Sequence, residues 1–219
     1  MQDKKAQLEP EGMYHIYNRA NGHEQLFLHA ENYRFFLEKY QHYIFPIAQT
    51  YCYCLMPNHF HFVVKIRSEE ELLGFSKAIR TTTLPKFQTL EELKGNEELK
   101  EQNLSKAISK QFSKLFSSYT QAFNKVNHRK GSLFMKNFNR KKISDSNYLL
   151  KLIHYIHHNP VEARLATTPK DWKYTSYAAF ISNEPTQLER AEVLALFNDR
   201  DNFIYCHQEL PQLTGIELF

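Results

Sequence analysis

The stretch Met56-Pro57-Asn58-His59-Phe60-His61-Phe62-Val63-Val64 predicts a β-strand that carries two histidines on one face. Residues 51–55, just before it, are rich in aromatic and strand-forming side chains, and Pro57-Asn58 is typical of a turn, so we expect two antiparallel strands. Side chains alternate across a strand, which places His59 and His61 on the same face. The opposite face should turn toward the core, because it holds Phe60, Phe62, Val64 and Ile66.

The two histidines are candidate metal ligands. Their backbone positions should lie roughly 7 Å apart on one strand face, and neutral imidazoles at that spacing can converge on one divalent ion. On the residues alone, two other interpretations stay open. The histidines can be satisfied or solvent-facing, or they can form a structural zinc site with Cys52 and Cys54 of the preceding strand.

The segments on either side of this strand pair predict an α+β fold. We expect a first strand at residues 13–18, an amphipathic helix at 30–44 and a second helix over about 69–79. This βαββα order is that of a ferredoxin-like antiparallel sheet, and a basic strand at 133–143 is the candidate to complete it. The segments between are an inserted, acidic and partly helical stretch at residues 85–103 and a third helix at residues 105–126.

A last helix should begin at the start signal Ser144-Asp145-Ser146 and end before Pro160. Its buried stripe at helical spacing comprises Leu149, Leu152, Ile153 and Ile156. Tyr155 and Asn159 lie beside that stripe on one flank, with Tyr148 one heptad earlier. Such a pair can bring a phenol and an amide oxygen to one site, although a boundary tyrosine and an ordinary helix-terminal asparagine give the same pattern.

Composition indicates a folded protein without a membrane segment. The chain has 219 residues, of which 42% are hydrophobic and 14% aromatic, enough for one sizeable core. Its N-terminus lacks an apolar targeting region, and no apolar run approaches the roughly 18 residues of a membrane span. Three cysteines, an odd number, argue against a disulfide framework. We therefore expect a soluble, cytoplasmic protein.

Positive charge is concentrated in one region. The formal net charge is only +4, yet residues 102–144 contain no Asp or Glu. A contiguous basic region in an otherwise acidic chain is the electrostatic pattern of a polyanion site, although a solvated helix face followed by a basic loop would also produce it. The region's basic residues are Lys106, Lys110, Lys114, Lys125, Arg129, Lys130, Lys136, Arg140, Lys141 and Lys142.

An ordered set of motifs resembles one protein family. The strand Met56-Pro57-Asn58-His59-Phe60-His61 is similar to the histidine–hydrophobe–histidine strand of the HUH endonucleases, in the form carried by insertion-sequence transposases and REP-associated tyrosine transposases. The segment Tyr155-Ile156-His157-His158-Asn159-Pro160 resembles the Tyr-Ile-x-x-Asn-Pro-Val segment of the latter group. Further matches, in family order, are Tyr14 to Arg19, Tyr119 to Asn124, Gly131 to Phe134 and Trp172 to Tyr177.

The resemblance implies an HUH transposase fold with a C-terminal catalytic helix. It implies that Tyr155 is the nucleophile and that His59 and His61 bind a divalent metal, Mg or Mn, with Asn159 as a third ligand where the insertion-sequence branch commonly has Gln. The expected activity is cleavage and rejoining of single-stranded DNA through a 5′-phosphotyrosine intermediate, in transposition or in processing of repetitive palindromic elements. The expected DNA contacts are Arg129, Lys130, Lys136, Arg140, Lys141 and Lys142.

The resemblance covers about residues 13–180, so we expect a catalytic domain over 1–182 and a C-terminal extension over 183–219. The expected partner is single-stranded or hairpin DNA, with no membrane, and a homodimer stays open. His154, His157 and His158 point away from Tyr155 at helical angles, and we expect them to be surface or DNA-facing residues. The rival functions are a zinc-stabilised DNA-binding module without catalysis and a hydrolytic metal site without a covalent step.

Overall fold

A computed structural model describes residues 5–80 and 97–212. Its centre is a four-stranded antiparallel sheet with the strand order β2-β3-β1-β4. The strands are β1 (Met13–Arg19), β2 (Ala48–Met56), β3 (His59–Ile66) and β4 (Asn139–Ile143). Within the described ranges, no helix is both long enough and apolar enough to cross a membrane.

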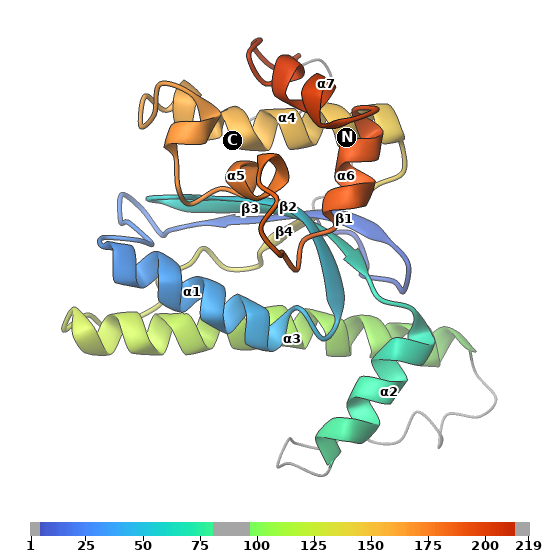
Figure 1. Cartoon of the computed structure of the whole chain (residues 1–219). Coiled ribbons are helices and arrows are strands. Elements are labelled where there is room, and N and C mark those ends of the chain that lie inside the picture. The colour runs from blue at the N-terminus through green and yellow to red at the C-terminus, as the bar shows by residue number, and fades with distance from the viewer. Residues whose placement is uncertain (1–4, 81–96, 213–219) are drawn as a thin grey trace.

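One face of the sheet packs against α1 (Ala30–Tyr43) and α3 (Glu97–Val126), below the sheet in Figure 1. The core on this side is dense in aromatic rings, because alternate residues of β3 deliver Phe60 and Phe62 to it. Phe36 of α1 and Tyr119 of α3 meet edge to face, 5.1 Å apart between ring centroids. A further helix, α2 (Glu69–Arg80), follows β3.

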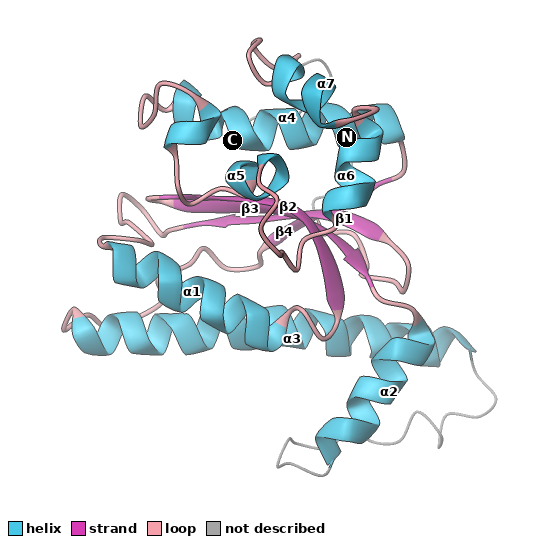
Figure 2. Cartoon of the chain, viewed as in Figure 1, coloured by secondary structure: helices cyan, strands magenta, loops and turns pink. Residues whose placement is uncertain are grey.

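The other face carries α4 (Ser146–Glu162) and the C-terminal helices, above the sheet in Figures 1 and 2. Leu152 and Ile156 of α4 pack with Val63 of β3, which shares its strand face with the two histidines. Phe180 and Phe203, from the C-terminal segment, complete this second core. The short helices are η2 (Pro169–Asp171), α5 (Tyr177–Ile181), α6 (Arg190–Leu196) and α7 (Arg200–Cys206).

Both outer strands of the sheet are bonded to segments of the same chain. On β2, the Leu55 amide donates to the Tyr174 carbonyl at 2.9 Å, and the Glu189 amide donates to the Thr50 carbonyl at 3.0 Å. On β4, the Ala6 amide donates to the Arg140 carbonyl at 3.1 Å. The segments that follow α4 therefore serve as partial extra strands as well as links between helices.

The expected α+β architecture is confirmed. The sheet contains the strand pair around His59 and the first strand at the predicted places, and Phe60 and Phe62 lie on the face opposite His59 and His61. The stripe of α4 is buried as predicted, with Leu152, Ile153 and Ile156 each 0% exposed. Alternation on the strands and helical spacing on α4 were sufficient for these assignments.

Three predicted boundaries were wrong. Helix α3 begins at Glu97 rather than at residue 105, so residues 97–103 of the predicted insertion are helical, while 85–96 lie outside the described residues. The strand predicted over 133–143 is regular only over β4, because Asn137 has a φ of 61°, a left-handed conformation that cannot continue a strand. Pro160 lies inside α4, although it has no amide to donate to the carbonyl four residues earlier, and the helix ends two residues after it, at Glu162.

Candidate active site

The two histidines of β3 face α4, as predicted, but they differ in exposure. His61 lies opposite Tyr17 on β1 and Cys54 on β2, and it is completely buried. His59 lies at the start of the strand, opposite Arg19, and is partly exposed. Their ring centroids are 5.2 Å apart and the rings are nearly perpendicular. The site therefore runs from a covered end at His61 to an open end at His59.

Each histidine is held through its Nδ1 atom. The Nδ1 of His59 lies 2.7 Å from the Oδ1 of Asn58, and the Nδ1 of His61 lies 2.9 Å from the Nε2 of His15. An amide oxygen only accepts hydrogen bonds, so Nδ1 of His59 carries the proton and its lone pair lies on Nε2. Ligand histidines are commonly oriented in this way, with one nitrogen on a protein acceptor and the other directed at the metal.

Asn159 joins the histidine strand to the tyrosine helix. Its Nδ2 donates to the Tyr155 carbonyl at 3.0 Å, one turn back along α4. Its side chain also forms a hydrogen bond with His59, and that bond partly offsets the effect of burial, which lowers the pKa of His59 to about 4. A neutral His59 is the form that binds metal. The three candidate ligands thus lie together, although they come from β3 and α4.

Tyr155 packs beside His61 in the same cluster. Their rings are nearly perpendicular with centroids 6.0 Å apart, and Tyr155 is 3% exposed. Burial raises the pKa of Tyr155 to about 12, the charge of Glu162 adds to this effect, and a hydrogen bond with Asn159 opposes it. Tyr148, the competing candidate, lies farther toward the helix start, where the Lys141 ammonium sits 4.7 Å from its ring centroid.

The donor set fits a divalent ion of the Mg or Mn type only with further oxygen ligands. Two imidazole nitrogens and one amide oxygen are a mixed set that Mn accepts, and further oxygen atoms would have to complete its coordination. Among the described residues, no group of three or more His, Cys, Asp or Glu side chains is placed to hold a metal. Cys54 shares the strand face with His61, but burial raises the pKa of its thiol, which disfavours the thiolate that zinc requires.

His15 was not predicted as a site residue, yet it contacts the site directly. It is 5% exposed, and burial, with Lys141 as a second cause, lowers its pKa to about 3. The Tyr17 ring packs beside it, with ring centroids 4.6 Å apart and the ring planes tilted by 31°. The available signal was strand alternation, since residues 13–19 place His15 and Tyr17 on one face and Tyr14 with Ile16 on the other.

Of the predicted DNA contacts, Lys130 and Lys136 are exposed side chains near the start of the segment that leads into β4. Arg129 is engaged within the fold instead. Its guanidinium donates to the Asn124 side chain at 2.9 Å and to the Ser132 carbonyl at 2.8 Å, and it forms an ion pair with Glu24. Arg129 therefore stabilises the loop in which its neighbour Lys130 is exposed.

The three basic residues of β4 occupy different environments. Arg140 lies over the Phe138 ring, 5.0 Å from its centroid, and its Nε donates to the Ala6 carbonyl at 2.7 Å. Lys141 is 5% exposed and turns toward α4, beside His15. Lys142 is exposed and pairs with Glu9 at 2.5 Å. These residues do not form one continuous exposed basic patch.

The expectation that His154, His157 and His158 face solvent or DNA was wrong, because the C-terminal helix covers them. All three are buried, and they surround His207, which follows α7. The Nδ1 of His157 lies 2.9 Å from the Nε2 of His207, and the Nε2 of His158 lies 2.9 Å from the His207 carbonyl. This histidine cluster (His154, His157, His158 and His207) fastens the C-terminal helix to the far side of α4.

No family model and no curated protein sequence matches the chain. Among solved structures, it is similar to one described as a REP-associated tyrosine transposase bound to a REP hairpin. The TM-score is 0.51 with 13% sequence identity, over 84% of this chain and 89% of that chain. At this identity the likeness establishes the fold, and the expected resemblance to the REP-associated tyrosine transposase fold is confirmed at that level.

Proposed function

We propose that this protein cleaves and rejoins single-stranded or hairpin DNA through a covalent 5′-phosphotyrosine intermediate on Tyr155. The observation that carries the proposal is the packing of Tyr155 beside His61, 6.0 Å between ring centroids, with Asn159 bonded to the Tyr155 carbonyl at 3.0 Å and in contact with His59. It gathers a phenol, an amide and a histidine pair into one site. The fold likeness supports the proposal, because the matched transposase was solved with a REP hairpin.

In the proposed reaction, the Tyr155 oxygen attacks the phosphorus of a DNA phosphodiester. A phosphorus–oxygen bond to the tyrosine forms while the bond to the 3′ oxygen breaks. The phenol loses its proton to solvent, and the departing oxygen takes one up as a 3′-hydroxyl. Attack by another 3′-hydroxyl reverses these steps and rejoins the strands, so no high-energy cofactor is consumed.

His59 and His61 would hold a Mg or Mn ion through their Nε2 atoms, with Asn159 contributing its amide oxygen. A divalent ion there supplies polarisation of the scissile phosphate and neutralises the charge that develops on it. Such help matters more here than for an exposed tyrosine, because the pKa of Tyr155 is raised to about 12. A nearby positive charge favours the phenolate and therefore the nucleophile.

DNA would enter at the His59 end of the site. His59 is partly exposed, whereas His61 and Tyr155 are covered by α4 and the strands. Lys130 and Lys136 are exposed members of the predicted contact set that offer charge to phosphates. On β4, Lys142 is also exposed but paired with Glu9, and Arg140 and Lys141 add positive charge from more covered positions. On this view, residues 1–182 hold the catalytic machinery, and the extension from residue 183 braces α4 from behind.

The polarity of the covalent link provides the test. The full chain is incubated with hairpin oligonucleotides that carry single-stranded tails, in Mn or Mg, with the label at either end of the DNA. A 5′-phosphotyrosine should leave a 3′-labelled strand on the protein in a denaturing gel, while the 5′-labelled strand shortens and stays free. Cleavage without any protein-linked DNA would instead favour metal-dependent hydrolysis.

A further inference from the structure

A groove of about 430 Å³ lies on the face of the sheet opposite Tyr155. One wall is α3, and the other is the segment 132–140 that leads into β4. Asn18 of β1 closes one end, and its Nδ2 donates to the Met135 carbonyl at 3.1 Å. The groove therefore has walls fixed by the fold, because α3 and β1 both belong to the packed core.

The α3 wall is lined with hydroxyl groups. Ser109, Ser113, Ser117 and Thr120 all line the groove, and at about 100° per residue they fall within roughly 80° of one another on the helix. These short side chains keep the wall open while presenting donors and acceptors along its length. Such a wall suits a ligand rich in oxygen atoms.

Positive charge lies on one wall of the groove and beside the other wall. Lys136 and Arg140 line it, and as far as the structure describes the chain its lining contains no Asp or Glu. Lys110 and Lys114 lie one turn apart beside the hydroxyl wall; burial, together with the charge of Lys110, lowers the pKa of Lys114. The mutual repulsion of these lysines would be relieved by a bound anion.

The floor and size of the groove favour one unpaired strand over a duplex. Phe116, Phe134 and Phe138 reach the floor from the core, and Met135 stands 47% exposed at the rim. Sites for single strands combine a basic track with apolar surfaces against which sugars and bases pack. A recess of about 430 Å³ can admit part of an unpaired strand, whereas a duplex could touch only the rim.

The groove opens at the same end of the sheet as the candidate active site. Asn18 is in its lining, and the next residue, Arg19, pairs with His59 on β3. The two sites lie on opposite faces and are separated by the segment 134–138, which carries Lys136. One DNA strand could pass from His59 around that segment and into the groove.

We propose that this groove binds the sugar–phosphate backbone of an unpaired DNA segment that flanks the cleavage point. The inference rests on the proposed function in one respect: it takes the polyanion that binds in the groove to be DNA. In this proposal, Ser113, Ser117 and Gln121 of α3, with Lys136 opposite them, contact the part of the DNA strand that extends beyond the active site. Because hydroxyls and lysines read the backbone, binding there should depend on single-strandedness more than on sequence.

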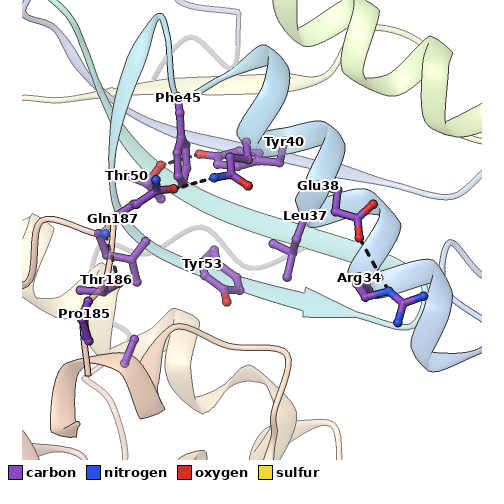
Figure 3. A pocket seen from close by; sticks show the side chains of 13 residues that line it. Arg34, Leu37, Glu38, Tyr40, Phe45, Thr50, Tyr53, Pro185, Thr186 and Gln187 are labelled. Atoms are coloured by element: carbon purple, nitrogen blue, oxygen red, sulfur yellow. Dashed lines mark hydrogen bonds and ion pairs between the residues drawn. The ribbon is translucent and has the colours of Figure 1, made fainter. Parts of the chain in front are cut away.

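Two glutamines form a matched test. Gln121 is exposed in the groove, and its Nε2 donates to the Ser117 hydroxyl at 3.1 Å. Gln41 is exposed on α1, and its Nε2 donates to Gln187 at 2.9 Å in a second cavity of about 410 Å³ at the opposite edge of the sheet (Figure 3). Gln121→Glu and Gln41→Glu each add one charge without changing side-chain size.

Fluorescence anisotropy in EDTA measures binding without cleavage, with a hairpin that has a single-stranded tail and the same hairpin without it. Gln121→Glu should weaken binding of the tailed hairpin by about fivefold or more, whereas Gln41→Glu should stay within about twofold of the unmodified chain. Lys136→Ala should reduce the slope of log affinity against log salt by about 1. Circular dichroism and thermal unfolding check that each variant is folded.

Equal effects of the two glutamine changes, or equal Gln121→Glu sensitivity of the tail-less hairpin, would overturn the groove assignment. Adduct formation separates this inference from the proposed function. If the unmodified chain forms no adduct but its binding remains sensitive to Gln121→Glu, the covalent chemistry is wrong and the groove stands.

Discussion

His15 and His61, from neighbouring strands, are joined nitrogen to nitrogen at 2.9 Å, with both rings buried. For His61 to bind a metal through Nε2, its Nδ1 must carry the proton and His15 must accept it. His15 therefore fixes the tautomer and the ring orientation of a candidate ligand without approaching the metal itself. Partners of this kind are worth about 10- to 100-fold in metal affinity.

Replacing His15 tests that role. His15→Phe fills a similar space but removes the acceptor, so Mn affinity measured by electron paramagnetic resonance should fall by about 10- to 100-fold. His15→Gln restores an acceptor and should recover part of the loss. The exposed His42→Gln serves as the control. Unchanged Mn affinity in His15→Phe would mean that the contact with His61 is only a packing interaction.

The histidine pair should act as a unit. His59→Ala and His61→Gln should each reduce DNA cleavage by at least about 100-fold, because either change removes one of two imidazole ligands. The double variant should be little worse than the single ones, as expected for groups that share one ion. His61 is fully buried, so His61→Gln is preferred to alanine and its folding is checked by thermal unfolding. Full cleavage by either single variant contradicts the metal assignment.

The nucleophile should be Tyr155 and not Tyr148. Tyr155→Phe keeps the ring against His61 and should bind DNA normally, yet it should form no covalent adduct. Tyr148→Phe should keep adduct formation within about tenfold, which is about 1.4 kcal/mol of barrier, because the Tyr148 ring lies beside Lys141 rather than Asn159. Peptide mapping of the adduct decides the matter. DNA mapped to another tyrosine in Tyr155→Phe would refute the choice.

The histidine cluster should make stability sensitive to mild acid. Burial lowers the pKa of His207 to about 3, so below the usual pKa of about 6.5 the unfolded chain binds a proton that the folded chain excludes. Its contribution to the free energy of unfolding is complete above about pH 6.5, and it is lost as the pH falls toward 3, by at most about 1.4 kcal/mol per pH unit.

Urea unfolding at pH 7.5 and 5.5 measures this effect. His207→Gln cannot titrate, so its stability should fall by about 1 kcal/mol less between these values than that of the unmodified chain. Buried histidines that do not touch His207, such as His15 and His61, contribute equally to both proteins and cancel in the comparison. The exposed His42→Gln should behave as the unmodified chain does. Identical pH dependence in His207→Gln would show that His207 does not drive acid sensitivity.

Substitutions of Arg129 and Lys130 should distinguish a positive charge that stabilises the fold from one that is available to bind DNA. Arg129→Ala removes a guanidinium that bonds Asn124, Ser132 and Glu24, and it should lower the free energy of unfolding by about 2 kcal/mol. Lys130→Ala removes an exposed charge and should leave stability within about 0.5 kcal/mol. Chemical unfolding measures both. A larger stability loss in Lys130→Ala than in Arg129→Ala would reverse these roles.

Local patterns were sufficient to predict the parts of the site that lie on single elements. Alternation placed His59 and His61 on one face of β3, and helical spacing placed Tyr155 and Asn159 on one flank of α4. The packing of that flank against β3 is a tertiary contact, and only the resemblance of motifs suggested it. His15 was missed because its link to the site is a contact with His61 on a neighbouring strand, and alternation within residues 13–19 does not reveal which strands are neighbours.

The histidines of α4 show that helical angles alone do not predict which side chains are exposed. Helical angles correctly separated them from Tyr155, but the inference that a side away from the sheet is exposed assumed that nothing covers it. Phe203 and His207 of the C-terminal segment cover that side. The segment has short helices and few hydrophobic residues at helical spacing, so the sequence contains no clear pattern that predicts its packing against α4.

The covered outer strands of the sheet also bear on self-association. Thr50 and Leu55 on β2, and Arg140 on β4, already bond to backbone groups of their own chain. An exposed strand edge is the usual template for sheet extension between molecules and for aggregation. These described positions are therefore not available to pair with an edge strand of a second copy of the chain.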